Sequence, residues 1–162
     1  MDLFFYYIKI QKKRETMDIK AYMTQDHLDC DETFAQMENV ASKEGLPATK
    51  EIFDKFADEM EHHFQMEERV LFPMFEQKTG MTQGPTEMMR QEHTQMRALI
   101  KQLSSAQSEA NLDKFFGLTE TFMILVQQHN MKEEQMLYTM IQQHMQADND
   151  TILEMMQSMI TQ

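Results

Sequence analysis

The sequence predicts an all-α protein, an antiparallel up-down-up-down four-helix bundle with a short C-terminal helix. Glycine and proline are rare among the 162 residues, at four and three, and residues that favour helices are abundant. Apolar side chains recur at alternating steps of three and four residues in four segments of similar length. No segment alternates apolar and polar residues as a half-buried strand does. Short links between the segments favour antiparallel neighbours.

The first two helices are expected over residues 18–42 and 48–77. Gly45 and Pro47 lie between them, which is typical of one helix ending and the next beginning. Pro73 lies inside the second segment, where its missing N–H predicts a bend or a loosened last turn.

The third and fourth helices are expected over residues 86–106 and 112–145. Residues 78–85, with two glycines and a proline, form the clearest loop. The apolar stripe of the fourth helix is expected to include Met136 and Met140. Beyond a cap at residues 148–150, a short amphipathic helix is expected. We therefore expect residues 18–146 to form the bundle and residues 147–162 to carry the C-terminal helix.

Residues 1–17 are interpreted as an N-terminal extension: a disordered segment, a docking arm, or a leader ahead of a true start at Met17. Its apolar run, residues 3–8, is far shorter than the ~20 residues of a membrane-spanning helix. Its basic residues follow the apolar part, which is the reverse of a signal peptide. The single cysteine, Cys30, excludes an intramolecular disulfide and favours a reducing compartment. We expect a soluble, cytoplasmic protein.

The net charge of −12 argues against nucleic acid and anionic membranes as partners, because both select for basic surfaces. Acidic residues such as Asp58, Glu61 and Glu68 are expected on the solvated surface. Cys30 is expected to be a small buried hydrophobic residue.

One histidine-containing pattern occurs twice in the chain. His63 and Glu67 are four residues apart, and His129 and Glu133 repeat this spacing 66 residues later. A single histidine precedes each motif by 36 residues; these are His27 and His93. Internal repetition of residue types that bind metal is a strong signal.

All six of these residues fall on the predicted apolar stripes, so they should point into the bundle core. Burying six titratable groups together is unfavourable unless something compensates their charge. Metal cations do so, because they bind neutral imidazole and ionised carboxylate. Residues i and i+4 project from one helix face, so each glutamate can bridge two metal ions. We predict a binuclear site of four histidines and two glutamates, which suits iron, with manganese or zinc possible.

These residues resemble the hemerythrin-like family, also called the HHE cation-binding domain, over about residues 22–145. The resemblance implies a four-helix bundle with a non-haem di-iron centre. It assigns ligand roles to six residues: His27, His63, Glu67, His93, His129 and Glu133.

The chain departs from the oxygen-carrying members of that family at two places. They have a fifth histidine where this sequence has Arg97, and their last motif is HxxxxD, whereas here the acid is Glu133, or Glu134 at the longer spacing. The four-histidine set is more similar to the metal domain of iron-centre repair and nitric-oxide-responsive proteins. The Cys-pair module that often precedes that domain is absent from this sequence.

The leading functional expectation is a protein that binds or senses a small diatomic ligand, O₂ or NO, at the di-iron centre. No nucleophile–base set or nucleotide motif occurs, so no catalytic residue is assigned and an enzyme is not favoured. The alternatives are iron-centre repair or iron delivery, peroxide or NO reduction, and metal storage. His62, which points about 100° away from His63, is expected outside the ligand set. Spacing alone does not place Tyr22 or Tyr138 within hydrogen-bonding distance of the site.

Overall fold

The computed structural model describes residues 17–159, which contain helices and no strand. The expected all-α class is therefore confirmed. The helices are α2 (Ile19–Glu44), η1 (Leu46–Thr49), α3 (Lys50–Met66), η2 (Glu67–Leu71), α4 (Phe72–Thr79), α5 (Pro85–Ser108), α6 (Leu112–Lys132), η3 (Glu133–Leu137), α7 (Tyr138–Met145), η4 (Gln146–Asp148) and α8 (Asn149–Ser158). The predicted docking arm or leader lies outside the described residues, apart from Met17.

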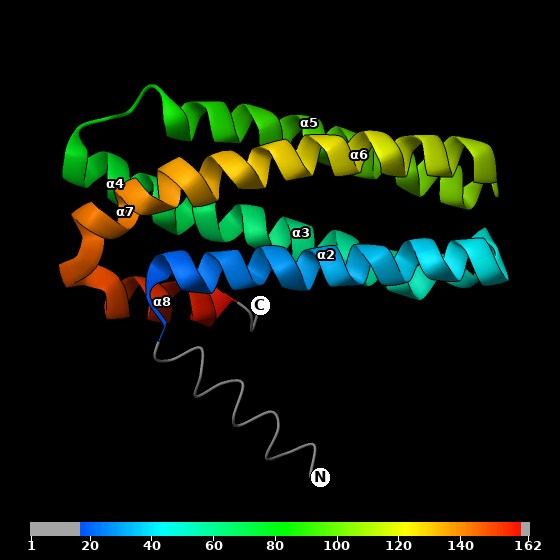
Figure 1. Cartoon of the computed structure of the whole chain (residues 1–162), viewed down its shortest axis with the longest axis horizontal. Coiled ribbons are helices and arrows are strands. Elements are labelled where there is room, and N and C mark those ends of the chain that lie inside the picture. The colour runs from blue at the N-terminus through cyan, green and yellow to red at the C-terminus, as the bar shows by residue number, and fades with distance from the viewer. Residues whose placement is uncertain (1–16, 160–162) are drawn as a thin grey trace, which may run out of the picture.

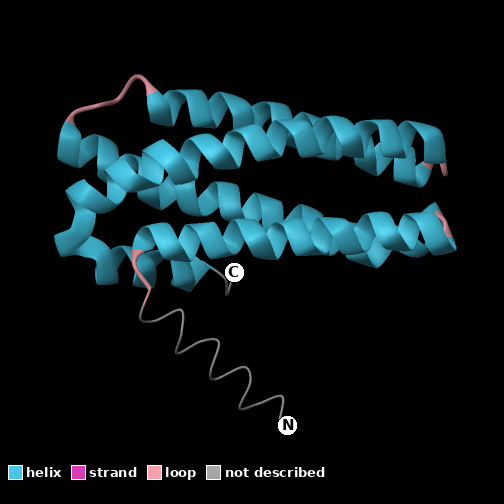
Figure 2. Cartoon of the chain, in the orientation of Figure 1, coloured by secondary structure: helices cyan, strands magenta, loops and turns pink. Residues whose placement is uncertain are grey.

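Four long helical rods form the bundle, as predicted. They are α2, the continuous run from α3 through η2 to α4, then α5, and the run from α6 through η3 to α7. In Figure 1, α2 and α3 lie side by side, as do α5 and α6, and α8 returns beside the start of α2. Figure 2 shows that the loop between α4 and α5 is the longest interruption of helix in the described chain.

The helix ends follow local sequence signals. The Asp18 side chain accepts a hydrogen bond from the Ala21 backbone N–H at 2.7 Å, and Asn111 caps α6 through Lys114 in the same way. Gly80 ends α4 at a φ of 73°, a left-handed conformation that glycine adopts without a steric penalty.

The core consists of two apolar clusters with the polar site between them along the bundle. One cluster is formed around Tyr22, Leu71, Phe75 and Ile141, with α8 covering it through Ile152. The other is built on aromatic side chains such as Phe34, Phe56 and Phe122, which are in ring contact with one another. Each of the four rods that carry the repeated histidines contributes side chains to both clusters.

Two wide helical turns of the π type, η2 and η3, occur at equivalent places of the repeat and begin at Glu67 and Glu133. The loosened turn expected at Pro73 thus lies earlier, over residues 67–71. Because η3 contains no proline, proline alone does not explain these turns. π-helical turns often occur at functional sites.

Because η3 contains an extra residue, the buried face of the fourth helix differs from the predicted apolar stripe. Met136 is 48% exposed, whereas Leu137 and Tyr138 are buried. A π turn adds one residue, so the inward face moves by one position, about 100°. The prediction for Met136 was wrong because it assumed an uninterrupted α-helix.

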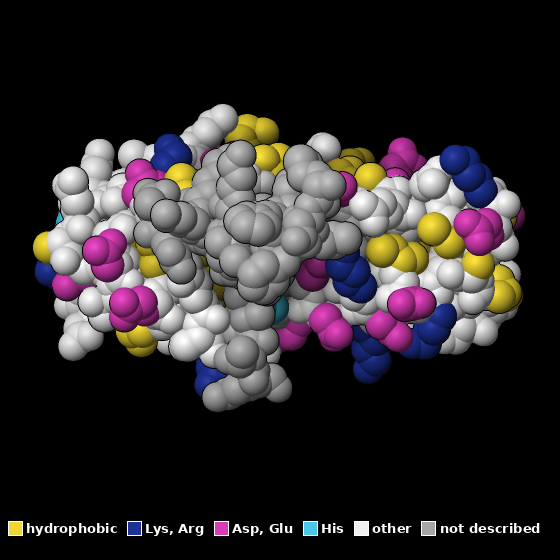
Figure 3. Space-filling view, turned by 90° about the horizontal axis from the view of Figure 1, so that it is seen from below, with side chains coloured by type: hydrophobic (Ala, Val, Ile, Leu, Met, Phe, Trp, Pro, Cys, Tyr) yellow, Lys and Arg dark blue, Asp and Glu magenta, His cyan; other side chains and the backbone are white. Residues whose placement is uncertain are grey.

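The described surface is mixed in character. On the face seen in Figure 3, acidic side chains are spread along the length of the bundle, with basic ones among them. No described helix combines the length and the apolar character that crossing a membrane requires.

Candidate metal centre

The structure brings all six sequence-predicted ligand residues together in the middle of the bundle. Every one of them is buried, with exposed fractions of 0 to 3%. Their side-chain atoms form two groups that could each hold a metal ion, His27–His63–Glu133 and Glu67–His93–His129–Glu133, with atoms within 4.8 Å of one another. Because Glu133 belongs to both groups, the two form one continuous cluster.

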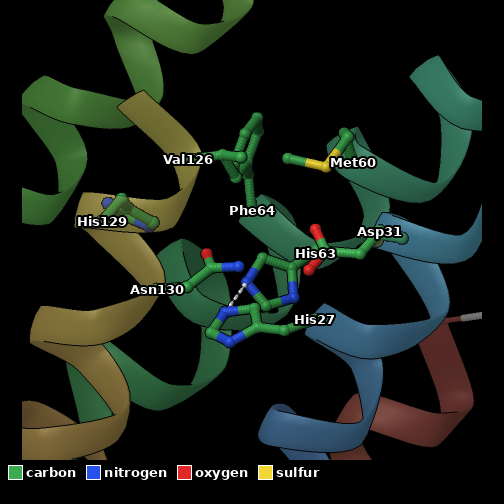
Figure 4. Close-up of a pocket in the computed structure, with 9 residues that line it drawn as sticks. His27, Asp31, Met60, His63, Phe64, Val126, His129 and Asn130 are labelled. Atoms are coloured by element: carbon green, nitrogen blue, oxygen red, sulfur yellow. Dashed lines mark hydrogen bonds between the residues drawn. The ribbon is translucent and has the colours of Figure 1, made fainter. Parts of the chain in front are cut away.

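The four histidines form two facing pairs. The Nε2 atoms of His27 and His63 are 3.2 Å apart, and those of His93 and His129 are also 3.2 Å apart. We call these the first and the second histidine pair. Figure 4 shows the two rings of the first pair facing each other across the interior of the bundle.

The two buried glutamates lie between the pairs. Glu67 Oε2 is 3.4 Å from the Nε2 of His63 and 3.1 Å from that of His93. Glu133 reaches His27 and His129, each at 3.0 Å. Each carboxylate therefore touches one histidine from each pair, which is the arrangement of a bridging ligand.

An outer ring of carboxylates fixes the imidazoles. The Nδ1 of His27 contacts Glu134, that of His63 contacts Asp26, that of His93 contacts Glu68 and that of His129 contacts Glu92, each at 2.8 Å. Carboxylate oxygens only accept hydrogen bonds, so each Nδ1 is the protonated nitrogen. The Nε2 atoms consequently face the cluster, the orientation in which outer carboxylates hold metal-binding histidines.

Sequence reasoning missed this outer ring, and the expectation that Glu68 lies on the solvated surface was wrong. A signal was present, because an acid precedes each single histidine and a second glutamate follows each bridging glutamate. Neighbouring residues on a helix point about 100° apart, so each of these acids is directed at the adjacent helix. Which histidine it meets there is set by the packing of the helices.

The chemistry of the inner atoms fits a metal ion. Glu67 Oε2 and Glu133 Oε1 are buried and have no hydrogen-bond partner among the described residues. Neutral imidazoles that donate from Nδ1 present the lone pairs of Nε2, which repel each other at 3.2 Å. Cations placed between these donors satisfy the lone pairs of both residue types.

Without metal, protons partly take over this role. Burial by itself lowers the pKa of His27, but hydrogen bonds and charges from Glu133 and Glu134 raise it to about 9. The pKa of His93 is likewise raised to about 9 by Glu67 and Glu68, against the effect of burial. The raised pKa values favour the protonated forms of His27 and His93 in the metal-free core, and metal ions would displace these protons.

Tyr138 is a further residue of the site, which the sequence spacing did not place there. Its hydroxyl lies 2.6 Å from Glu67 Oε1, 2.9 Å from Glu133 Oε2 and 3.2 Å from His27 Nε2. The π turn brings Tyr138 onto the face of Glu133 at a spacing of five residues. Burial and the charges of the two glutamates raise the pKa of this phenol, so it stays protonated and can donate to either carboxylate.

Other residues lie outside the cluster. His62 is half-buried and belongs to neither group of potential ligands among the described residues, as predicted. Arg97 donates to Glu61 and Glu68 at 2.8 Å and lies over the Phe64 ring. Cys30 is buried, and burial raises the pKa of its thiol, which agrees with its expected role in packing.

A helical bundle with a buried His/Glu cluster of this geometry defines a metal-binding protein. The sequence model of the hemerythrin HHE cation binding domain matches residues 18–141. The chain therefore belongs to the hemerythrin HHE cation-binding family, as the repeated motifs suggested. Neither the curated proteins nor the solved structures that were searched gave a match.

Removing the charge of one outer carboxylate should weaken metal binding without disturbing the fold. In Glu134→Gln, the His27 imidazole loses its anionic partner and becomes a weaker donor, so we expect affinity to fall about 10- to 100-fold. Competition with a chromophoric chelator measures this change. Glu120→Gln, an exposed position on α6, makes the same chemical change as a control. Equal affinity in both variants would contradict a role for the outer ring.

Proposed function

We propose that this protein holds a non-haem di-iron centre that binds or senses a small diatomic ligand, O₂ or NO. The observation that carries the proposal is the pair of buried glutamates, each touching one histidine from each pair. The proposed ligands are the six residues of the cluster: His27, His63, Glu67, His93, His129 and Glu133.

The choice of iron rests on the donor set. Imidazole nitrogen together with carboxylate oxygen suits iron, with manganese and zinc as competitors. The two groups of donor atoms share Glu133, and the two ions of binuclear sites typically lie roughly 3.5–4 Å apart. When bound, an iron pair supplies reversible ligand binding and one-electron chemistry, whereas the chain holds the donors in place and excludes bulk water.

A small pocket beside the first histidine pair supports access by a small ligand. It is lined by apolar and polar side chains together, and His129 of the second pair is among them (Figure 4): His27, Cys30, Asp31, Met60, His63, Phe64, Val126, His129 and Asn130. Its apolar side chains suit an uncharged diatomic molecule, and it leaves no room for an organic substrate. We therefore favour ligand binding over an enzyme that acts on an organic compound.

Iron-centre repair, iron delivery, peroxide or NO reduction and metal storage are the competing functions. The four-histidine set is common to several of them, and a cytoplasmic location, which we also propose, suits them all. Storage is the least favoured, because a closed set of six donors with a fixed outer ring is built to retain a defined centre.

Anaerobic reconstitution tests the proposal. We expect elemental analysis to give about two iron ions per chain. Exposure of the ferrous protein to NO or O₂ should then change its optical spectrum, and removal of the gas should reverse the change. One ion or none per chain would contradict the binuclear site. Catalytic turnover of peroxide or NO, or iron transfer to an apo acceptor, would favour the competing functions.

A further inference from the structure

The outer rings of the two histidine pairs differ in charge, although the inner residues repeat closely. In the second pair, Arg97 donates to Glu68 at 2.8 Å, and Glu68 accepts from His93. The residue 66 positions earlier than Arg97 is Asp31. Asp31 lies close enough to Glu134, the outer carboxylate of the first pair, for the two negative charges to interact. A cation at one position thus corresponds to an anion at the other.

The remaining outer carboxylates show the same difference. Lys132 forms an ion pair with Glu92, which holds His129. The residue 66 positions earlier is Met66, so the counterpart carboxylate, Asp26, gains no cation from this position. Within residues 17–159, neither Asp26 nor Glu134 forms an ion pair with a lysine or an arginine. Cations therefore offset both outer carboxylates of the second pair, although Arg97 also pairs with Glu61. No lysine or arginine among the described residues pairs with the outer carboxylates of the first pair.

From this difference we infer that the two metal positions are unequal, and that the position at His27 and His63 binds a divalent cation more tightly. The inference rests on the proposed binuclear site and goes beyond it, because it concerns charges outside the inner ligands, which include two histidines at each position and Glu133 in both groups. Arg97, Lys132 and Asp31 act through the outer carboxylates, so they tune the positions without touching the metal.

The physical reason is long-range electrostatics through a short chain of contacts. A guanidinium hydrogen-bonded to an outer carboxylate lies on the order of 9 Å from an ion on the other side of the imidazole, by the sum of the hydrogen-bond, ring and metal–nitrogen lengths. At this distance, and with an effective dielectric constant between those of water and the protein interior, one unit charge changes the affinity for a dication on the order of tenfold. A neutralised carboxylate also polarises its imidazole less, which makes Nε2 a weaker donor.

Two matched ligand deletions measure each position separately. His63→Ala removes a ligand of the first position, and His129→Ala removes the equivalent ligand of the second. Titration of the metal-free full chain with Co²⁺, followed by absorption and chelator competition, gives the affinity of the position left intact. We expect His129→Ala to bind its first Co²⁺ at least about tenfold more tightly than His63→Ala.

Exchanging the two outer charges should reverse this order. The double variant Asp31→Arg, Arg97→Asp keeps the net charge and moves the cation next to Glu134. In this background, we expect His63→Ala to bind Co²⁺ more tightly than His129→Ala. The control is Glu109→Lys, Lys114→Glu, which reverses a surface ion pair of 3.1 Å. Lys114 is fifteen residues before His129 on α6, ~22 Å along the helix, so this control should preserve the original order.

Lys132→Met provides a milder test should the exchanged chain fold poorly, since methionine is the residue at the equivalent position 66. It should raise the affinity of the second position alone, which is measured in the His63→Ala background. Equal affinities of the two deletion variants, or an order that neither the exchange nor Lys132→Met alters, would overturn the inference. Failure of the unaltered chain to bind two Co²⁺ ions would instead overturn the proposed binuclear function.

Discussion

Glu67→Ala and Glu133→Ala should each abolish the binuclear centre, so that metal content falls from about two ions per chain to one or none. Each glutamate is fully buried and touches one histidine from each pair. Its loss removes one of the two carboxylates that link the histidine pairs, so a single linking carboxylate remains. Elemental analysis after reconstitution, combined with the optical spectrum, measures the loss.

His62→Ala is the matched control for these two variants. His62 neighbours a proposed ligand in the sequence but belongs to neither group of potential ligands, so the variant should keep about two ions. Equal metal loss in all three variants would show that the effect comes from destabilised helices and not from lost bridging donors. Retention of two ions in either glutamate variant would contradict the bridging role.

In the metal-free protein, the free energy of unfolding is expected to decrease as the pH rises from 6.5 to about 9. The pKa values of His27 and His93 are near 9 in the folded state, against 6.5 as the reference for the unfolded chain. The folded state therefore binds more protons across this window, and its stability decreases with rising pH. The contribution is fully present below pH 6.5. One such shift corresponds to about 3 kcal/mol. Because the two histidines interact with the same cluster, their contributions do not simply add, and we expect a combined loss of at least about 3 kcal/mol.

Denaturant unfolding of the chelator-treated protein at pH 6 and at pH 9.5 measures this change. Metal-loaded protein is the control, because bound cations take the place of the imidazole protons and should remove most of the decline. A free energy of unfolding that stays level or increases over the same window in the metal-free protein would contradict the predicted protonation of the core.

The sequence predicted those parts of the site that depend only on spacing within a single helix. His63 and Glu67 lie one helical turn apart, so their shared inward face can be deduced without any knowledge of neighbouring helices. The apolar residues around His27 and His93 place these side chains inward by the same reasoning. For this reason, all six inner residues were found from periodicity and the internal repeat.

Tyr138 illustrates what periodicity does not provide. On an uninterrupted α-helix, Met136 would continue the buried stripe, and Tyr138 would point about 140° away from Glu133. The π turn at Glu133–Leu137 changes the inward face, which places the Tyr138 hydroxyl on both buried glutamates. A helical stripe drawn from sequence alone assumes a regular α-helix, so it misplaces this residue.

The sequence by itself determined the four helices, their inward faces and the repeated His/Glu set, because each depends on spacing within one helix. The tertiary structure alone decided which helices face each other at which rotation. That choice pairs Asp26 with His63 and Glu134 with His27 across neighbouring helices. It also places Arg97 on the outer ring of only one histidine pair. Contacts between helices depend on their relative rotation and axial shift, and these are set by packing of the whole core.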